Sequence, residues 1–144
     1  MTTIEAMFGL AIELRNKGNY VDSINVLNKI LDDFPDDARR HGVYAVLGGV
    51  YRNLDDNDKA LTNFKKATEL NPKSELASLG LYITLAKLGR DVEAIHEMIR
   101  YLRSYPADLY KDTLEELLEG LERGYMINYE DDIKRIARVN GFKI

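Results

Sequence analysis

The side chains of this chain that are best suited to chemistry are two histidines and several short runs of carboxylates. His41 and His96 lie far apart in the sequence, and neither has a second histidine or a cysteine at the spacing of metal ligands. The carboxylate runs, such as Asp32-Asp33 and Asp55-Asp56, fall at predicted turns and helix ends, where they cap helices. No nucleophile is paired with a general base. The residues therefore predict no catalytic, cofactor or metal site, and we expect no enzyme.

Composition and charge limit the remaining classes of function. The 144 residues are 45% hydrophobic and 31% charged, which is enough for one domain with a real core, expected over 1–144. A net charge of −4 disfavours nucleic acid as a partner, because neutralising phosphates requires a basic face. A basic protein partner is favoured instead. The absence of cysteine fits a reducing compartment, and we expect the cytoplasm.

The apolar stretches are too short or too charged to act at a membrane. The longest weakly polar run, Gly42 to Tyr51, cannot span a bilayer. The first residues have no basic head and include Glu5 and Glu13, which is unlike a signal peptide. We therefore expect no membrane partner.

The positions of the three prolines reveal a repeat. Pro35, Pro72 and Pro106 stand in similar contexts, 37 and 34 positions apart. A period of this length is typical of stacked helix pairs. The residues twelve, eight and five positions before each proline are Ser23, Leu27 and Ile30, then Ala60, Phe64 and Ala67, then Ala94, Met98 and Tyr101.

The spacing within each unit predicts two helices joined by a tight turn. Glycine or aspartate in the turns "KGNY", "LDDND" and "LGRD" can adopt a left-handed conformation, and a polar residue follows to cap the next helix. Each proline ends its unit because it cannot continue a helix. We expect helices near 3–17, 20–33, 38–54, 57–70, 74–88 and 91–104.

The middle unit resembles the tetratricopeptide repeat, a 34-residue helix pair. It matches that family's pattern at Leu47, Gly48, Tyr51, Ala60, Phe64, Ala67 and Pro72. The resemblance implies an all-α fold, a right-handed α-α superhelix of three helix pairs in a small free-standing protein. The implied repeats cover 4–35, 41–72 and 75–106, with the first and third degenerate.

Residues 107–144 depart from the period and predict one or two capping helices. Leu114, Leu117, Leu118 and Leu121 form one apolar stripe, so this helix is expected to close the open end of the stack. A shorter helix follows, with Asn128 as its expected cap and Gly141 in its stop signal. The expected total is eight helices.

In this repeat class the first helix of each pair lines a concave groove, so the resemblance implies a site there. The inward positions are Phe8, Ile12, Arg15 and Asn16, then Ala45, Gly49, Arg52 and Asn53, then Leu76, Leu79, Ile83 and Lys87. Repeats that clamp chaperone tails carry Lys, Asn and Arg at positions occupied here by Phe8, Ile12, Val46, Leu76 and Gly80. That function is therefore not expected. Some of the apolar positions, Phe8 and Ile83 among them, could equally belong to the core.

The leading hypothesis is a non-enzymatic module that binds a segment of another protein in this groove, as a chaperone or adaptor. A second hypothesis is an immunity protein that covers a basic bacterial toxin with an acidic C-terminal face. That face would contain Glu115, Glu119, Glu122, Glu130 and Asp131. A third is a self-associating scaffold subunit. The sequence leaves the oligomeric state open.

Overall fold

The computed structural model describes residues 3–144, so the first two positions of the expected domain lie outside the described residues. Within 3–144 the chain forms eight α-helices and one short 3-10 helix, without strands. The expected all-α class and helix count are confirmed. The helices are α1 (Ile4–Asn16), α2 (Tyr20–Asp33), α3 (Arg40–Asn53), α4 (Asn57–Leu70), α5 (Glu75–Lys87), α6 (Asp91–Leu102), α7 (Lys111–Glu122), η1 (Ile127–Tyr129) and α8 (Glu130–Val139).

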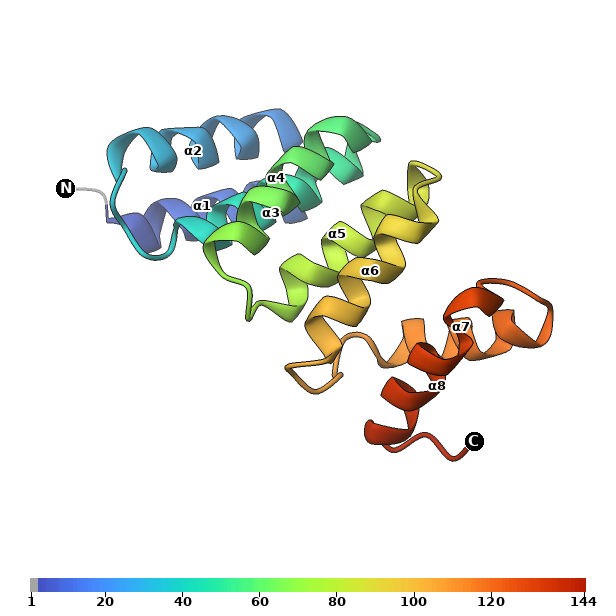
Figure 1. The fold of residues 1–144 in the computed structure, drawn as a ribbon. Helices are drawn as coiled ribbons and strands as arrows, with labels where there is room; N and C mark the ends of the chain where they lie inside the picture. Colours follow the sequence, from blue (N-terminus) through green and yellow to red (C-terminus); the bar gives the residue numbers. More distant parts are fainter. Residues whose placement is uncertain (1–2) are drawn as a thin grey trace.

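The helices are arranged as a solenoid of consecutive pairs. Figure 1 shows α1 and α2, then α3 and α4, then α5 and α6 stacked in chain order, with α7 and α8 at the C-terminal end. Each helix of the first three pairs packs on its partner, and each pair packs on the next one, the third through the contact of α6 with α8. The structure is thus built from neighbouring contacts, as in other repeat architectures.

The three turns inside the helix pairs adopt the left-handed conformation that the sequence predicts. Gly18, Asp55 and Gly89 have φ of 80°, 60° and 76°. A left-handed residue here lets the chain reverse within a few positions. Of the polar residues that follow, only Asp56 forms the expected cap, accepting a hydrogen bond from the Lys59 amide at 3.2 Å.

The helix α3 begins two positions later than the expected residue 38. The Asp37 carboxylate accepts hydrogen bonds from the Arg39 amide at 2.8 Å and from Arg39 Nε at 2.9 Å, which holds 37–39 in a turn. Arg39 also pairs with Glu5 of α1. The side-chain hydrogen bond from Arg39 lowers the pKa of Asp37 to about 2.

The expected cap of the last helix was wrong. Asn128 lies inside η1, and α8 begins at Glu130 after Tyr129. The 3-10 turn takes up the residues between the left-handed Met126 and the helix. The acidic first turn of α8 and the stop at Gly141, with φ of 92°, follow the sequence pattern.

A single aromatic ring joins the second and third helix pairs. Phe64 of α4 is buried between two glycines, Gly48 of α3 and Gly80 of α5. A Cβ placed on Gly48 would lie 2.8 Å from the ring, and one placed on Gly80 would overlap it. Glycine is therefore required on both sides for the three helices to approach.

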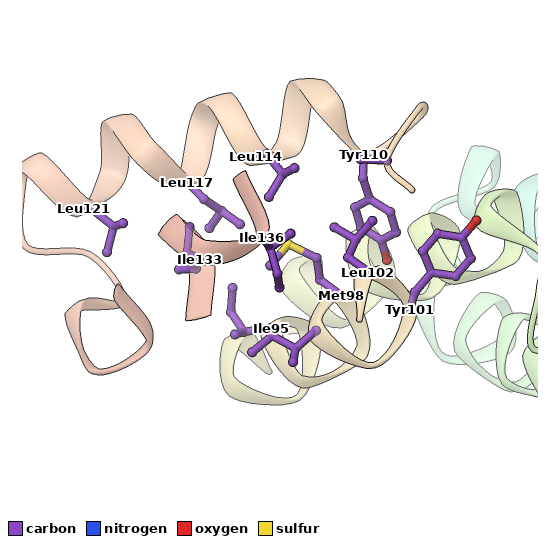
Figure 2. Close-up of a cluster of buried hydrophobic side chains, with 12 residues drawn as sticks. Ile95, Met98, Tyr101, Leu102, Tyr110, Leu114, Leu117, Leu121, Ile133 and Ile136 are labelled. Carbon is purple, nitrogen blue, oxygen red and sulfur yellow. The ribbon is translucent and has the colours of Figure 1, made fainter. Parts of the chain in front are cut away.

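The C-terminal helices close the stack through an apolar cluster. Figure 2 shows side chains of α7 and α8 directed toward the outer helix α6 of the third pair. The buried members include Ile95, Met98 and Leu102 of α6, Leu114, Leu117 and Leu121 of α7, and Ile133 and Ile136 of α8. Leu118 is only partly buried at the edge of this cluster.

Side chains from other helices fix the loop that leads into α7. Glu75 of α5 accepts hydrogen bonds from the backbone amides of Asp108 at 2.8 Å and Tyr110 at 3.1 Å. Asn140, which follows α8, accepts one from the Ala107 amide at 2.8 Å. These bonds satisfy amides near the start of α7, whose own N-cap residue provides no side-chain bond.

Candidate functional site: a groove along the odd-numbered helices

Three hollows follow one another along the odd-numbered helices. The N-terminal hollow, about 430 Å³ in volume, lies between α1 and α3 and contains Ile4, Glu5, Phe8, Gly9, Arg39, His41, Gly42 and Val43. The central hollow, about 160 Å³, contains Arg15, Ala45, Val46, Gly49, Arg52, Phe64, Leu76, Leu79, Gly80 and Ile83. The C-terminal hollow, about 620 Å³, contains Leu79, Tyr82, Ile83, Ala86, Lys87, Leu109, Asp112, Thr113, Glu116, Leu117 and Tyr125.

The central and C-terminal hollows lie next to each other. Leu79 and Ile83 of α5 line both of them, so these two side chains form the ridge between the hollows. Leu79 also packs against the C-terminal cluster, which makes it part of the core as well as part of the surface.

Most of the groove positions that the sequence singles out line one of the hollows. Seven lie in the central hollow: Arg15, Ala45, Gly49, Arg52, Leu76, Leu79 and Ile83. Phe8 lies in the N-terminal hollow and Lys87 in the C-terminal hollow. Ile12, Asn16 and Asn53 line none of the three hollows. Ile12 is half-buried, and the two asparagines are the last residues of α1 and α3.

Two of the apolar positions belong largely to the core. Ala45 is buried against Ala67 and Ala77, where α3, α4 and α5 meet. Phe8 is partly buried on the cluster between the first two helix pairs. Leu76, by contrast, is 61% exposed at the rim of the central hollow. The apolar contact surface of the groove therefore centres on α5.

Arg52 is the most unusual side chain of the central hollow. Its guanidinium is half-buried and lies 5.6 Å from the centre of the Phe64 ring. Among residues 3–144 it forms no salt bridge, and its Nη1 atom is buried without a hydrogen-bond partner. Burial lowers the pKa of Arg52, since desolvation disfavours the charged form. An unpaired, partly desolvated cation is a favourable place for a partner's carboxylate.

A second arginine lies at the edge of the same hollow. Arg15 donates hydrogen bonds from Nε and Nη2 to the Asn16 side chain at 3.2 and 3.0 Å, which orients its guanidinium. It has no carboxylate partner within the part of the chain that the structure describes. No acidic residue lines the central hollow, so the hollow is positively charged.

The C-terminal hollow has the opposite charge on one wall. Leu109 and, on α7, Asp112, Thr113 and Glu116 face α5 across this hollow. Tyr82 and Tyr125 also line it, and burial raises the pKa of each. Sequence reasoning missed this wall because it assigned the apolar side of α7 to the cap and the carboxylates at 115, 119 and 122 to an acidic face. The helical spacing of 109, 112, 113 and 116, beside the leucine stripe, is the signal that could have identified it.

Of the residues proposed as an alternative acidic face, those on α7 are not paired with a cation within the described residues, whereas Glu130 on α8 is. Glu115, Glu119 and Glu122 are exposed on α7 and form no salt bridge among residues 3–144. On α8, Glu130 pairs with Lys134 at 2.6 Å, and Asp131 is exposed. The α7 carboxylates therefore carry most of the uncompensated charge.

The histidines lie apart in the fold as well. His41 lines the N-terminal hollow, while His96 on α6 lies 3.2 Å from the Tyr129 hydroxyl. Within residues 3–144, no three His, Cys, Asp or Glu side chains gather as a metal site would require. Over the same residues, no helix combines the length and apolar character needed to cross a membrane.

Comparisons with known proteins support the helical-repeat interpretation. Residues 41–74 match the family model described as "Tetratricopeptide repeat". A solved structure titled "Functional Characterization of Pseudomonas Aeruginosa pilF" resembles this fold with a TM-score of 0.72 and 16% sequence identity. The alignment covers 99% of this chain but 63% of the other, and at this identity it shows the fold alone. The search of curated proteins finds no match.

Proposed function

We propose that this helical-repeat protein, whose residues 41–74 match a tetratricopeptide-repeat model, binds a segment of a partner protein in the groove defined above. Tetratricopeptide repeats are a non-catalytic fold that mediates contacts between proteins. A chaperone or adaptor that holds an exposed segment of its partner is the role that fits this groove best.

The main support for the proposal is the guanidinium of Arg52, which is partly buried and has an Nη1 atom without a hydrogen-bond partner in the described part of the chain. Leaving a guanidinium partly buried without a carboxylate is unfavourable, and a partner's Asp or Glu would relieve that cost. Leu76, Leu79 and Ile83 beside it offer apolar contacts for the residues that flank such a carboxylate. Arginine is one of the residue types enriched at protein interfaces, whose buried centres are otherwise mostly apolar.

The alternative of an immunity protein is favoured by one feature, the exposed carboxylates of α7. Glu115, Glu119 and Glu122 would attract a basic partner over several ångströms and raise its association rate. This contact would use the outer side of α7 and leave Arg52 unpaired.

Site-specific crosslinking tests the groove directly. A photoreactive residue at Leu76 should capture the partner in extracts of the source cells, whereas the same residue at the exposed Lys66 of α4 should not. Arg52→Glu with Ile83→Asp should abolish capture while the circular dichroism spectrum stays helical. If the α7 face is used instead, Glu115→Lys with Glu119→Lys should abolish capture, and salt should weaken it steeply. Capture that survives the first pair of changes would overturn the proposal.

A further inference from the structure

The central and C-terminal hollows of the groove are charged differently, and we propose that the groove binds a partner segment whose charges lie in one fixed order along it. An acidic residue of the segment lies in the central hollow, and a basic residue lies in the C-terminal hollow. This inference rests on the proposed function, since it describes what the same groove selects. It adds the chemistry of the bound segment and the order of its charges along the groove.

The acidic residue is placed by the two arginines of the central hollow. Arg52 and Arg15 have no carboxylate partner among residues 3–144, and no acidic side chain lines this hollow. Gly49 leaves open space beside them, because nothing lies within 4 Å of the position where its Cβ would be. A basic residue of the partner would meet two like charges here, which costs binding energy.

The basic residue is placed by the wall that α7 provides. Asp112 and Glu116 line the C-terminal hollow, and neither forms a salt bridge within the described residues. Lys87 of α5 is the cation of this hollow, so the carboxylates exceed it by one. Leu117 and Tyr82 provide apolar surface for the methylene stem of a partner's Lys or Arg.

The ridge of Leu79 and Ile83 links the two charged sites. Both side chains line both hollows, so a segment that crosses from one hollow to the other must pass over them. An apolar residue of the partner fits this ridge. The preferred segment therefore carries an acidic, an apolar and a basic position in that order along the groove, and a reversed segment would bring like charges together.

Selection from randomised peptides tests the order without knowledge of the natural partner. Displayed peptides that are long enough to span both hollows are selected for binding to the wild-type chain. Peptides that also bind the double variant Arg52→Glu with Ile83→Asp are removed. We expect the selected peptides to combine Asp or Glu with Lys or Arg, with an apolar residue between them. One selected peptide, labelled with a fluorophore, then serves as the probe in anisotropy titrations.

Neutralising one charged side chain at a time tests the central and C-terminal hollows separately, and each variant has a matched control. Arg52→Gln should lower the affinity for the probe at least about tenfold. Lys66→Gln on helix α4, outside the groove, should leave the affinity unchanged. Glu116→Gln should lower the affinity for the probe ~2- to 5-fold, which is the effect expected from losing one exposed ion pair. Glu115→Gln removes the same charge from the neighbouring position outside the hollow and should have no effect.

A peptide with two acidic ends tests the order of the charges, whichever way its backbone runs. When the basic position of the selected peptide is made acidic, the peptide should bind the wild-type chain poorly and bind Glu116→Lys better. If this peptide binds the wild type as well as the selected one does, or if Glu116→Gln and Glu115→Gln behave alike, the charge order is wrong while the groove proposal stands. If the selected peptide binds Arg52→Glu with Ile83→Asp as well as the wild type, the proposed function itself fails.

Discussion

At the scale of single residues, the contact of Phe64 with two glycines has the clearest energetic consequence. The ring cannot move away from Gly80 without approaching Gly48, and the Arg52 guanidinium lies beside its face. A methyl group at either glycine must therefore displace helix backbone. The cost of such overpacking in a dense interior is larger than any gain in helix propensity.

We expect Gly80→Ala to destabilise the protein by about 1–3 kcal/mol, because its Cβ would overlap the Phe64 ring. Gly49→Ala is the control, since its Cβ meets nothing within 4 Å and alanine is the better helix former, worth about 0.5–1 kcal/mol. Urea unfolding followed by circular dichroism measures both. Equal effects in the same direction would contradict this account.

A second residue-scale prediction concerns Asp37. Hydrogen bonds from Arg39 lower its pKa from 3.8 to about 2. A lowered pKa means that the folded state favours the carboxylate, so this contribution to stability is complete above pH 3.8 and disappears as the pH falls through 2. NMR titration of the side-chain carboxyl should show a midpoint near 2. In Arg39→Gln the midpoint should return toward 3.8; an unchanged midpoint would mean that Arg39 is not the cause.

At the scale of helices, small residues set how closely the pairs approach. Ala60 on α4 is completely buried next to Leu81, Leu85 and Ala94 of the third pair. Its place in the repeat, twelve positions before Pro72, predicted such a contact. The volume available there is fixed by the two neighbouring helices of the next pair.

Ala60→Leu should therefore destabilise the protein by ~1–3 kcal/mol and lower its melting temperature, as measured by calorimetry or circular dichroism. Thr62→Leu, at an exposed position of the same helix, adds a comparable side chain without entering the core. A melting temperature that is the same for Ala60→Leu and wild type would contradict the close packing of the helix pairs.

The helices and their turns could be predicted from the sequence because they depend on local spacing and on residues such as Gly18 and Asp55, whose conformations are locally determined. The start of α3 could not, since Arg39 is held both by Asp37 and by Glu5 of α1, which is distant in the sequence. The need for Gly80 also escaped the pattern, because it arises from an aromatic ring of another repeat. For the groove, helix register placed Arg52 on the hollow, but only tertiary structure shows α7 opposite α5.

At the scale of the whole molecule, the C-terminal helices are needed to cover the third pair. The cluster in Figure 2 buries one side of α6, including Ile95, Met98 and Leu102, under α7 and α8. Without this cover, a continuous apolar surface would face water. The hydrogen bonds that backbone amides before α7 donate to Glu75 show that the attachment also has a polar component.

Deleting residues 107–144 should therefore cause aggregation, measured by light scattering after size-exclusion chromatography. Glu75→Gln is a milder companion change that weakens the attachment of the loop but leaves the apolar cluster in place, and it should elute at the same volume as the wild type. A truncated chain that stays monomeric and fully helical would mean that residues 107–144 are an appendage rather than a cap.

The Phe64 ring between Gly48 and Gly80 has a further consequence for recognition. Because it sets the spacing of α3 and α5, it also sets the width of the central hollow before any partner arrives. A preorganised site loses little conformational entropy when it is occupied, so more of the contact energy is available as affinity. The packing that joins two repeats thus also determines how selectively the hollow distinguishes one side chain from another.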